Sequence, residues 1–154
     1  MTIKRLRSEQ VESFPYGESV LAANFDISAA NGTNEYAGLS VDLPEAGVYE
    51  IACDIRGVVQ GATGTNWRLE ANLYNATDAA FVDHGARLII QAGEPNVLSQ
   101  STAGVAWFVE VDGPKTFMLY VQRDGGGSPT WTYSRIGSDY NGYTTMRYKK
   151  IAEI

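Results

Sequence analysis

The residue types with the strongest reactive chemistry are scarce in this sequence. The chain has 154 residues, with a single histidine, His84, and a single cysteine, Cys53. An Asp-His pair such as Asp83-His84 forms part of hydrolytic triads, but neighbouring residues of an extended segment point to opposite faces, and no nucleophile motif accompanies the pair. One His and one Cys do not make a zinc site of the usual ligand types. We therefore expect no enzymatic activity, no metal and no cofactor.

Cys53 lies in an alternating apolar stretch, in phase with Tyr49, Ile51 and Ile55. This phase predicts a buried structural thiol rather than a nucleophile. Because Cys53 is the only cysteine, no disulfide forms within the chain, which suits assembly in a reducing cytoplasm.

The acidic and glycine-rich segments do not match known ion or phosphate sites. Glu110, Asp124 and Asp139 are scattered and lack the spacing of a calcium loop. Gly125-Gly-Gly127 lacks the Lys-Ser/Thr ending of a phosphate-binding loop, so a flexible loop is expected over 123–129. A glycoside-cleaving pair of carboxylates stays open as an alternative, because the separation of such a pair is a property of the fold.

The segment 125–143 is the candidate binding site. Aromatic rings stack on sugar faces, and Asp and Asn side chains bond hydroxyl groups, so a loop held by a rigid sheet would bind a receptor or host glycan here. The candidate residues are Trp131, Tyr133, Asp139, Tyr140, Asn141 and Tyr143. In the alternative, Trp131 and Tyr133 lie on a strand and pack at a core edge or subunit interface, because aromatic residues favour strands.

The elements that would position these residues are β-strands. Short runs with period-two alternation recur between turn signals, which predicts a single antiparallel sandwich or barrel of about 8–10 strands. The domain is expected over 19–154, preceded by an N-terminal arm over 1–18. The predicted strands are 19–27, 36–43, 48–58, 67–74, 80–83, 87–91, 105–111, 116–122, 131–136 and 143–151.

The charge distribution limits the partners. A formal net charge of −6 argues against nucleic acid, which needs a basic surface. The chain contains neither a signal-peptide-like apolar run nor a segment approaching the roughly 20 apolar residues of a membrane span. Basic residues gather at Lys4, Arg5 and Arg7, and again near 147–150. Such clusters are either solvated termini or, for the first, an arm that docks onto an acidic partner.

Several segments resemble a known class of jelly roll. Leu-Pro-Glu-Ala-Gly-Val-Tyr-Glu-Ile at 43–51 resembles the Pro-x-x-Gly-x-Tyr entry to a central strand in domains of the tumour-necrosis-factor and complement globular-head type. The segments 69–78, 101–122 and 144–151 resemble strands and turns of related bacteriophage virion proteins. The resemblance implies a jelly roll of about ten strands, a homotrimer, and binding rather than catalysis. The missing signal peptide and collagen-like stalk favour the phage branch.

A trimer also has a physical rationale. The predicted strands 48–58 and 116–122 carry apolar residues on both faces, and such strands are usually covered on both sides, here by neighbouring subunits. The expected interface residues are Val48, Glu50, Ala52, Met118 and Tyr120.

Two virion roles compete. A capsid decoration, or cement, protein is a small trimer that clamps capsid subunits, whereas a tail-fibre head binds the host surface and is carried on a stalk. The predicted strands begin near residue 19, which leaves no room for a stalk and favours decoration. Lys4, Arg5 and Arg7 would then anchor the arm to the major capsid protein or another virion protein. The expected location is the virion, assembled in the host cytoplasm. A receptor-binding head and a carbohydrate-binding module are the alternatives.

Overall fold

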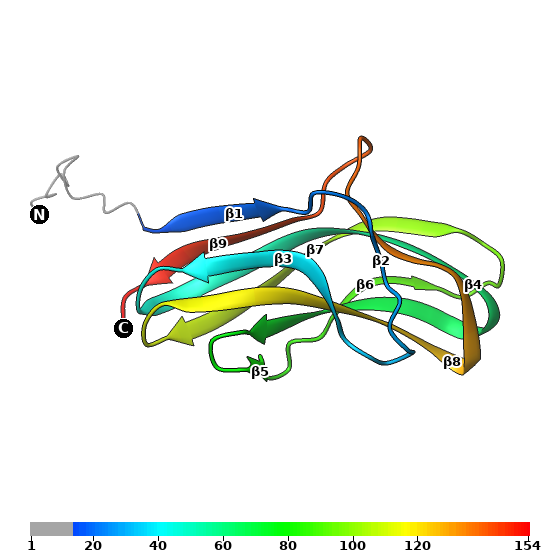
Figure 1. Ribbon diagram of the computed structural model, residues 1–154, viewed down its shortest axis with the longest axis horizontal. Helices are drawn as coiled ribbons and strands as arrows, with labels where there is room; N and C mark the ends of the chain where they lie inside the picture. The colour runs from blue at the N-terminus through cyan, green and yellow to red at the C-terminus, as the bar shows by residue number, and fades with distance from the viewer. Residues whose placement is uncertain (1–13) are drawn as a thin grey trace, which may run out of the picture.

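The computed structural model describes residues 14–154, which form nine β-strands (Figure 1). The predicted all-β class is confirmed. In chain order, the strands are β1 (Tyr16–Val20), β2 (Phe25–Asp26), β3 (Glu35–Leu43), β4 (Gly47–Asn75), β5 (Ala80–Phe81), β6 (Arg87–Ala92), β7 (Ser99–Val111), β8 (Lys115–Gly137) and β9 (Thr145–Ala152). Lys4, Arg5 and Arg7 lie outside the described residues.

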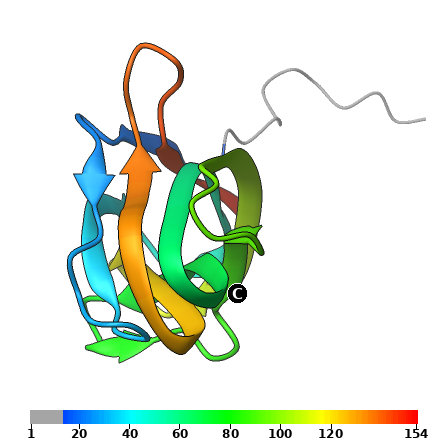
Figure 2. The same cartoon turned by 90° about the vertical axis from the view of Figure 1, so that its right-hand side faces the viewer.

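The strands form one antiparallel sheet organised around two long strands. The order is β1-β9-β4-β8-β2, with β3 added to β8, and with β5, β6 and β7 added to β4. Pairing of β4 with β8 extends from Arg56 opposite Gly137 to Asn75 opposite Phe117. The first part of β4 also pairs with β7 and β9, and its second part pairs with β6 and β5. The sheet curls so that these two parts enclose one core (Figure 2).

Period-two alternation places the core residues. In both parts of β4 the odd-numbered residues, such as Ile51 and Leu69, are buried, and the even-numbered ones are partly exposed. β8 follows the same phase at Phe117, Leu119 and Val121. Successive strand residues point to opposite faces, so one apolar phase fills the core and the other forms the outer surface.

β4 and β8 correct the predicted strand boundaries. The expected loops at 60–65 and 123–129 lie inside these strands, not between separate ones. Pairing continues through register shifts between Gln60 and Arg68, and Gly64 and Gly127 adopt φ values of 101° and 69° there. Bulges and glycines let a strand bend sharply while it stays paired. Because such a bend has the same glycine-rich composition as a turn, the sequence alone does not distinguish the two.

Gly61 marks the start of this bend. It is buried, it pairs with Trp131, and it lies against the indole ring of Trp67. A Cβ atom at Gly61 would lie 1.9 Å from two atoms of that ring. Trp67 is itself fully buried, so the close approach of backbone and indole requires glycine.

The predicted strand 19–27 is instead two short strands, β1 and β2. Between them Leu21 donates its backbone N–H to the carbonyl of Thr144, while Ile27 donates to the carbonyl of Ser134. The chain thus leaves β9 after β1 and joins β8 at β2. Residues 21–24 cross from one strand to the other, which interrupts the predicted single strand. β1 begins at Tyr16, three residues before the predicted start of the strands.

Candidate functional site

The structure divides the predicted aromatic segment between a strand and a loop. The β8–β9 loop projects from the sheet (Figures 1 and 2). Tyr140 and Tyr143 lie on this loop and are 93% and 61% exposed. Trp131 and Tyr133 lie on β8. Trp131 packs against the core, with the guanidinium of Arg123 5.6 Å from its ring centroid, whereas Tyr133 is exposed on the outer face.

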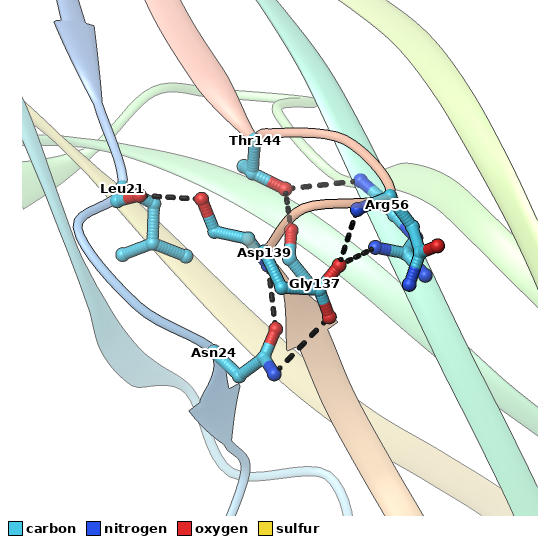
Figure 3. Close-up of polar contacts among 8 residues, drawn as sticks. Leu21, Asn24, Arg56, Gly137, Asp139 and Thr144 are labelled. Carbon is cyan, nitrogen blue, oxygen red and sulfur yellow. Dashed lines mark hydrogen bonds and ion pairs between the residues drawn. The ribbon is translucent and has the colours of Figure 1, made fainter.

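Asp139 anchors the projecting loop (Figure 3). Arg56 of β4 donates from Nη1 to Asp139 Oδ1 at 2.6 Å, and the backbone N–H of Asn141 donates to the same oxygen at 2.9 Å. The side-chain amide of Asn24 donates to Oδ2 at 3.3 Å. One carboxylate therefore ties the loop to the central strand and to the segment before β2.

Both ends of the loop are fixed by buried hydroxyl groups. The Ser138 hydroxyl donates to the Leu21 carbonyl, and the Ser138 backbone N–H donates to Asn24 Oδ1 at 2.7 Å. The Thr144 hydroxyl donates to the Gly137 carbonyl at 2.8 Å and accepts the Arg56 backbone N–H at 3.1 Å. The loop is thus a rigid projection rather than a loose connection.

The hydrogen bonds at Asp139 give the loop a defined pH response. The donated backbone N–H of Asn141 and the Arg56 guanidinium lower the pKa of Asp139 from 3.8 to about 2. Because only ionised Asp139 makes these contacts in full, they stabilise the anchored loop at every pH above the ordinary pKa of 3.8. This stabilisation is lost as the pH falls through the lowered pKa of about 2. We expect the amide NMR chemical shifts of Asn141 and Tyr140 to stay constant as the pH is lowered to 3, and to change as it is lowered further to 2.

Asp139→Asn is the matched variant for this pH response, because it removes the charge and keeps the shape. It should loosen the loop at neutral pH and abolish the acid transition. A midpoint near 3.8 in the wild-type protein would contradict the assigned anchor.

A pocket of about 280 Å³ lies beside the loop. Its main lining residues are Arg56 and Val58 of β4, Gln100 of β7, Tyr133 and Arg135 of β8, and Asp139. Arg135 is held by a bidentate ion pair with Asp26, with Nε–Oδ1 2.5 Å and Nη2–Oδ2 3.2 Å. Only Tyr133 and Asp139 among the pocket residues were candidates from the sequence, because the other residues gather there through pairing of distant strands.

The expected trimer residues lie on two different outer surfaces. Val48, Glu50 and Ala52 are on the part of β4 that pairs with β7 and β9. Met118 and Tyr120 are on the part of β8 that pairs with β3 and the second part of β4. All five side chains are partly exposed on the side away from the core.

Tyr120 belongs to an aromatic cluster on the outer surface. Its ring centroid lies 5.8 Å from that of Tyr36, 5.1 Å from that of Tyr74 and 5.4 Å from that of Phe81. Tyr36 and Phe81 are 37% and 44% exposed, so the cluster forms part of the surface. Exposed aromatic residues that pack together are typical of protein interfaces.

Cys53, Asp83 and His84 lie outside the pocket beside the β8–β9 loop. Cys53 is buried as expected, and burial raises the pKa of its thiol to about 12. Asp83 and His84 are exposed, and the His84 carbonyl accepts a hydrogen bond from Arg87 at 2.7 Å. Within residues 14–154, no three His, Cys, Asp or Glu side chains gather in a way that would hold a metal ion. Nor does that part of the chain contain a helix long and apolar enough to cross a bilayer.

Two of the three basic residues at 147–150, Arg147 and Lys150, are paired with acids. Lys150 is buried, and its Nζ lies 2.6 Å from Glu45 Oε1 and 2.7 Å from Glu153 Oε2. Arg147 pairs with Asp54 at 2.5 Å. The prediction that this basic cluster is simply solvated is therefore wrong for these two residues. Antiparallel pairing brings β9 beside acidic residues of β4 and of the turn before it.

Solved structures of infectious bursal disease virus share this fold. A mutant of the VP2 protein in derived T=1 particles is 11% identical, with a TM-score of 0.55 over 88% of this chain and 32% of that one. The structure of the Gx strain is 14% identical, with a TM-score of 0.51 over 92% of this chain and 37% of that one. The chain thus spans about a third of the length of these proteins, and identities this low show the fold alone. No protein-family model and no curated protein sequence matches the chain.

Proposed function

We propose that this protein is a non-enzymatic structural component of a virus particle, built on a jelly roll. The observation that carries the proposal is the fold shared with VP2 of infectious bursal disease virus, at a TM-score of 0.55 over 88% of the chain. A likeness of fold does not transfer function by itself. The aromatic cluster supports the proposal independently, because assembly proteins present such surfaces to their partners.

Within this role, we favour a trimeric decoration protein of a bacteriophage-like capsid. The partners are two further copies of the chain and the major capsid protein, and the location is the virion, assembled in the host cytoplasm. A threefold ring joins two different surfaces of each subunit. The separate placement of the Val48, Glu50 and Ala52 group and the Met118 and Tyr120 group therefore fits a ring in which one group contacts the other.

The test of this role is the position and copy number of the protein in purified particles. We expect quantitative mass spectrometry to find many copies, and electron cryomicroscopy to show density at threefold or quasi-threefold positions of the shell. Density at the tail tip alone would contradict decoration and favour a receptor-binding head. Particles without the protein would contradict both roles.

A receptor-binding role is the second candidate, and one observation favours it. The β8–β9 loop projects from the sheet and is held by the ion pair of Asp139 with Arg56 (Figure 3). It carries Tyr140 with 93% of its surface exposed. Binding sites are often loops supported by a rigid scaffold. A free-standing carbohydrate-binding module would use the same loop.

A further inference from the structure

We propose that the pocket beside the β8–β9 loop binds one uncharged sugar ring, such as the terminal hexose of a glycan. This inference rests on the receptor-binding candidate and defines its ligand and its site. The site is the groove between β4, β7, β8 and the loop base, rather than the exposed loop tip.

The size of the pocket suits a single ring. Its volume is about 280 Å³, just below the roughly 300–1,000 Å³ that sites for drug-sized ligands usually have, so it suits a smaller ligand. Gly137 lines it, and a Cβ atom there would lie 3.2 Å from Arg56 Cδ. The absence of a side chain at Gly137 thus lets the Arg56 stem lie against the β8 backbone at the edge of the pocket.

The polar groups of the pocket retain unused hydrogen-bonding capacity. Arg56 uses only Nη1 of its guanidinium, so Nε and Nη2 have no partner among residues 14–154. Asp139 Oδ2 accepts only the long 3.3 Å bond from Asn24, and the Gln100 amide has no partner within the described chain. Adjacent donors and acceptors of this kind bind neighbouring hydroxyl groups, each of which both donates and accepts.

The charges of the pocket favour a neutral ligand. Arg56 is paired with Asp139 at 2.6 Å, and Arg135 is paired with Asp26 at 2.5 Å. Each guanidinium is therefore already neutralised by a carboxylate. An anionic ligand bound at the free Nε and Nη2 of Arg56 would lie close to the Asp139 carboxylate, which repels a second negative charge.

Apolar surfaces complete the recognition. Tyr133 and Leu98 line the pocket with 44% and 48% of their surfaces exposed. Val58, which pairs with Gln100 and Arg135, also lines it. The C–H face of a sugar packs on such surfaces while its hydroxyl groups reach the polar side chains. The aromatic cluster around Tyr120 offers no comparable platform, because its rings are inclined to one another by 41–83°.

The test is titration of the full chain with glucose, galactose, mannose and N-acetylglucosamine, followed by amide NMR shifts. We expect at least one of these sugars to bind in the millimolar range and to shift the amides of Val58, Gln100 and Gly137. N-acetylneuraminic acid and glucuronic acid should bind at least about tenfold more weakly than that sugar. Gln100→Ala and Tyr133→Ala should each weaken binding by about tenfold, whereas the control Tyr143→Ala, on the loop outside the pocket, should leave it unchanged.

Three outcomes would overturn the proposal: no sugar binding, binding of the acidic sugars alone, or loss of binding in Tyr143→Ala but not in Tyr133→Ala. Folding of each variant is checked by its amide spectrum, which separates a lost contact from a lost fold. The structural role is tested separately: a protein found in particles that binds no sugar would refute the pocket and leave the structural role standing.

Discussion

Gly61→Ala is expected to lower the free energy of unfolding by about 3 kcal/mol, the upper part of the usual range for overpacking a core. The added methyl group would lie 1.9 Å from two ring atoms of Trp67. The indole is fully buried and donates from Nε1 to the Thr63 carbonyl at 3.2 Å, so it cannot move aside without losing packing and this bond. The alternative is a shift of the β4 backbone at its bend, which would disturb its pairing with β8.

Urea unfolding followed by tryptophan fluorescence measures this change, with all variants at one protomer concentration because association adds to apparent stability. Gly93→Ala is the matched control, since a Cβ atom there meets nothing within 4 Å. It should change the stability by no more than about 0.5 kcal/mol. Adding Trp67→Leu to Gly61→Ala should destabilise by less than the sum of the two single changes, because the smaller side chain makes room for the methyl group. Equal stability of Gly61→Ala and Gly93→Ala would contradict the tight bend.

Tyr120→Lys is expected to convert the proposed trimer to monomers. Tyr120 contacts Tyr36, Tyr74 and Phe81 in the aromatic cluster, so the substitution places a charge at the centre of the expected contact surface. Loss of a central aromatic residue at an interface typically raises the free energy of association by about 2 kcal/mol or more, which weakens association by about 30-fold. In sedimentation velocity at micromolar concentration, the wild-type protein should have the mass of three protomers and Tyr120→Lys the mass of one.

Ala52→Lys tests the second expected surface of the ring, on β4. If the trimer joins the two surfaces, this variant should also dissociate it. Tyr143→Lys is the control with the same charge change, because Tyr143 is 61% exposed on the projecting loop. A wild-type protein that is monomeric at micromolar concentration would contradict the trimer. Dissociation by Tyr120→Lys alone would remove Val48, Glu50 and Ala52 from the interface.

Alternation was the most informative signal in the sequence. The apolar phase of 48–58 and 67–74 identifies the buried faces, including those of Tyr49 and Leu69. The segment 116–122 is apolar on both faces, and the structure places Leu119 in the core and Tyr120 on the outer surface. The strand boundaries were less predictable. The glycine-rich segments around Gly61 and Gly125 have the composition of turns, but long-range pairing of β4 with β8 keeps both segments within strands.

The candidate site was predicted only in part. Tyr133 and Asp139 are conspicuous in the sequence because aromatic and acidic residues gather there. Arg56 has no distinctive neighbours, and its role follows only from a contact with Asp139, 83 residues further along the chain. Asn24 and Gln100 reach the same place from other strands and turns. These residues come together only because distant strands pair, and the local composition around each residue gives no sign of that pairing.

The position of β9 has a consequence for how the protein folds. β9 lies between β1 and β4, so two long-range pairings depend on residues near the end of the chain. Sheets dominated by contacts between distant residues fold slowly, because loop closure precedes the stabilising contacts. During synthesis, the edge of β4 over Val48–Asp54 therefore stays unpaired until Thr145–Ala152 has left the ribosome. Nascent chains are expected to be most prone to aggregation in that interval, and folding is expected to finish only after translation of β9.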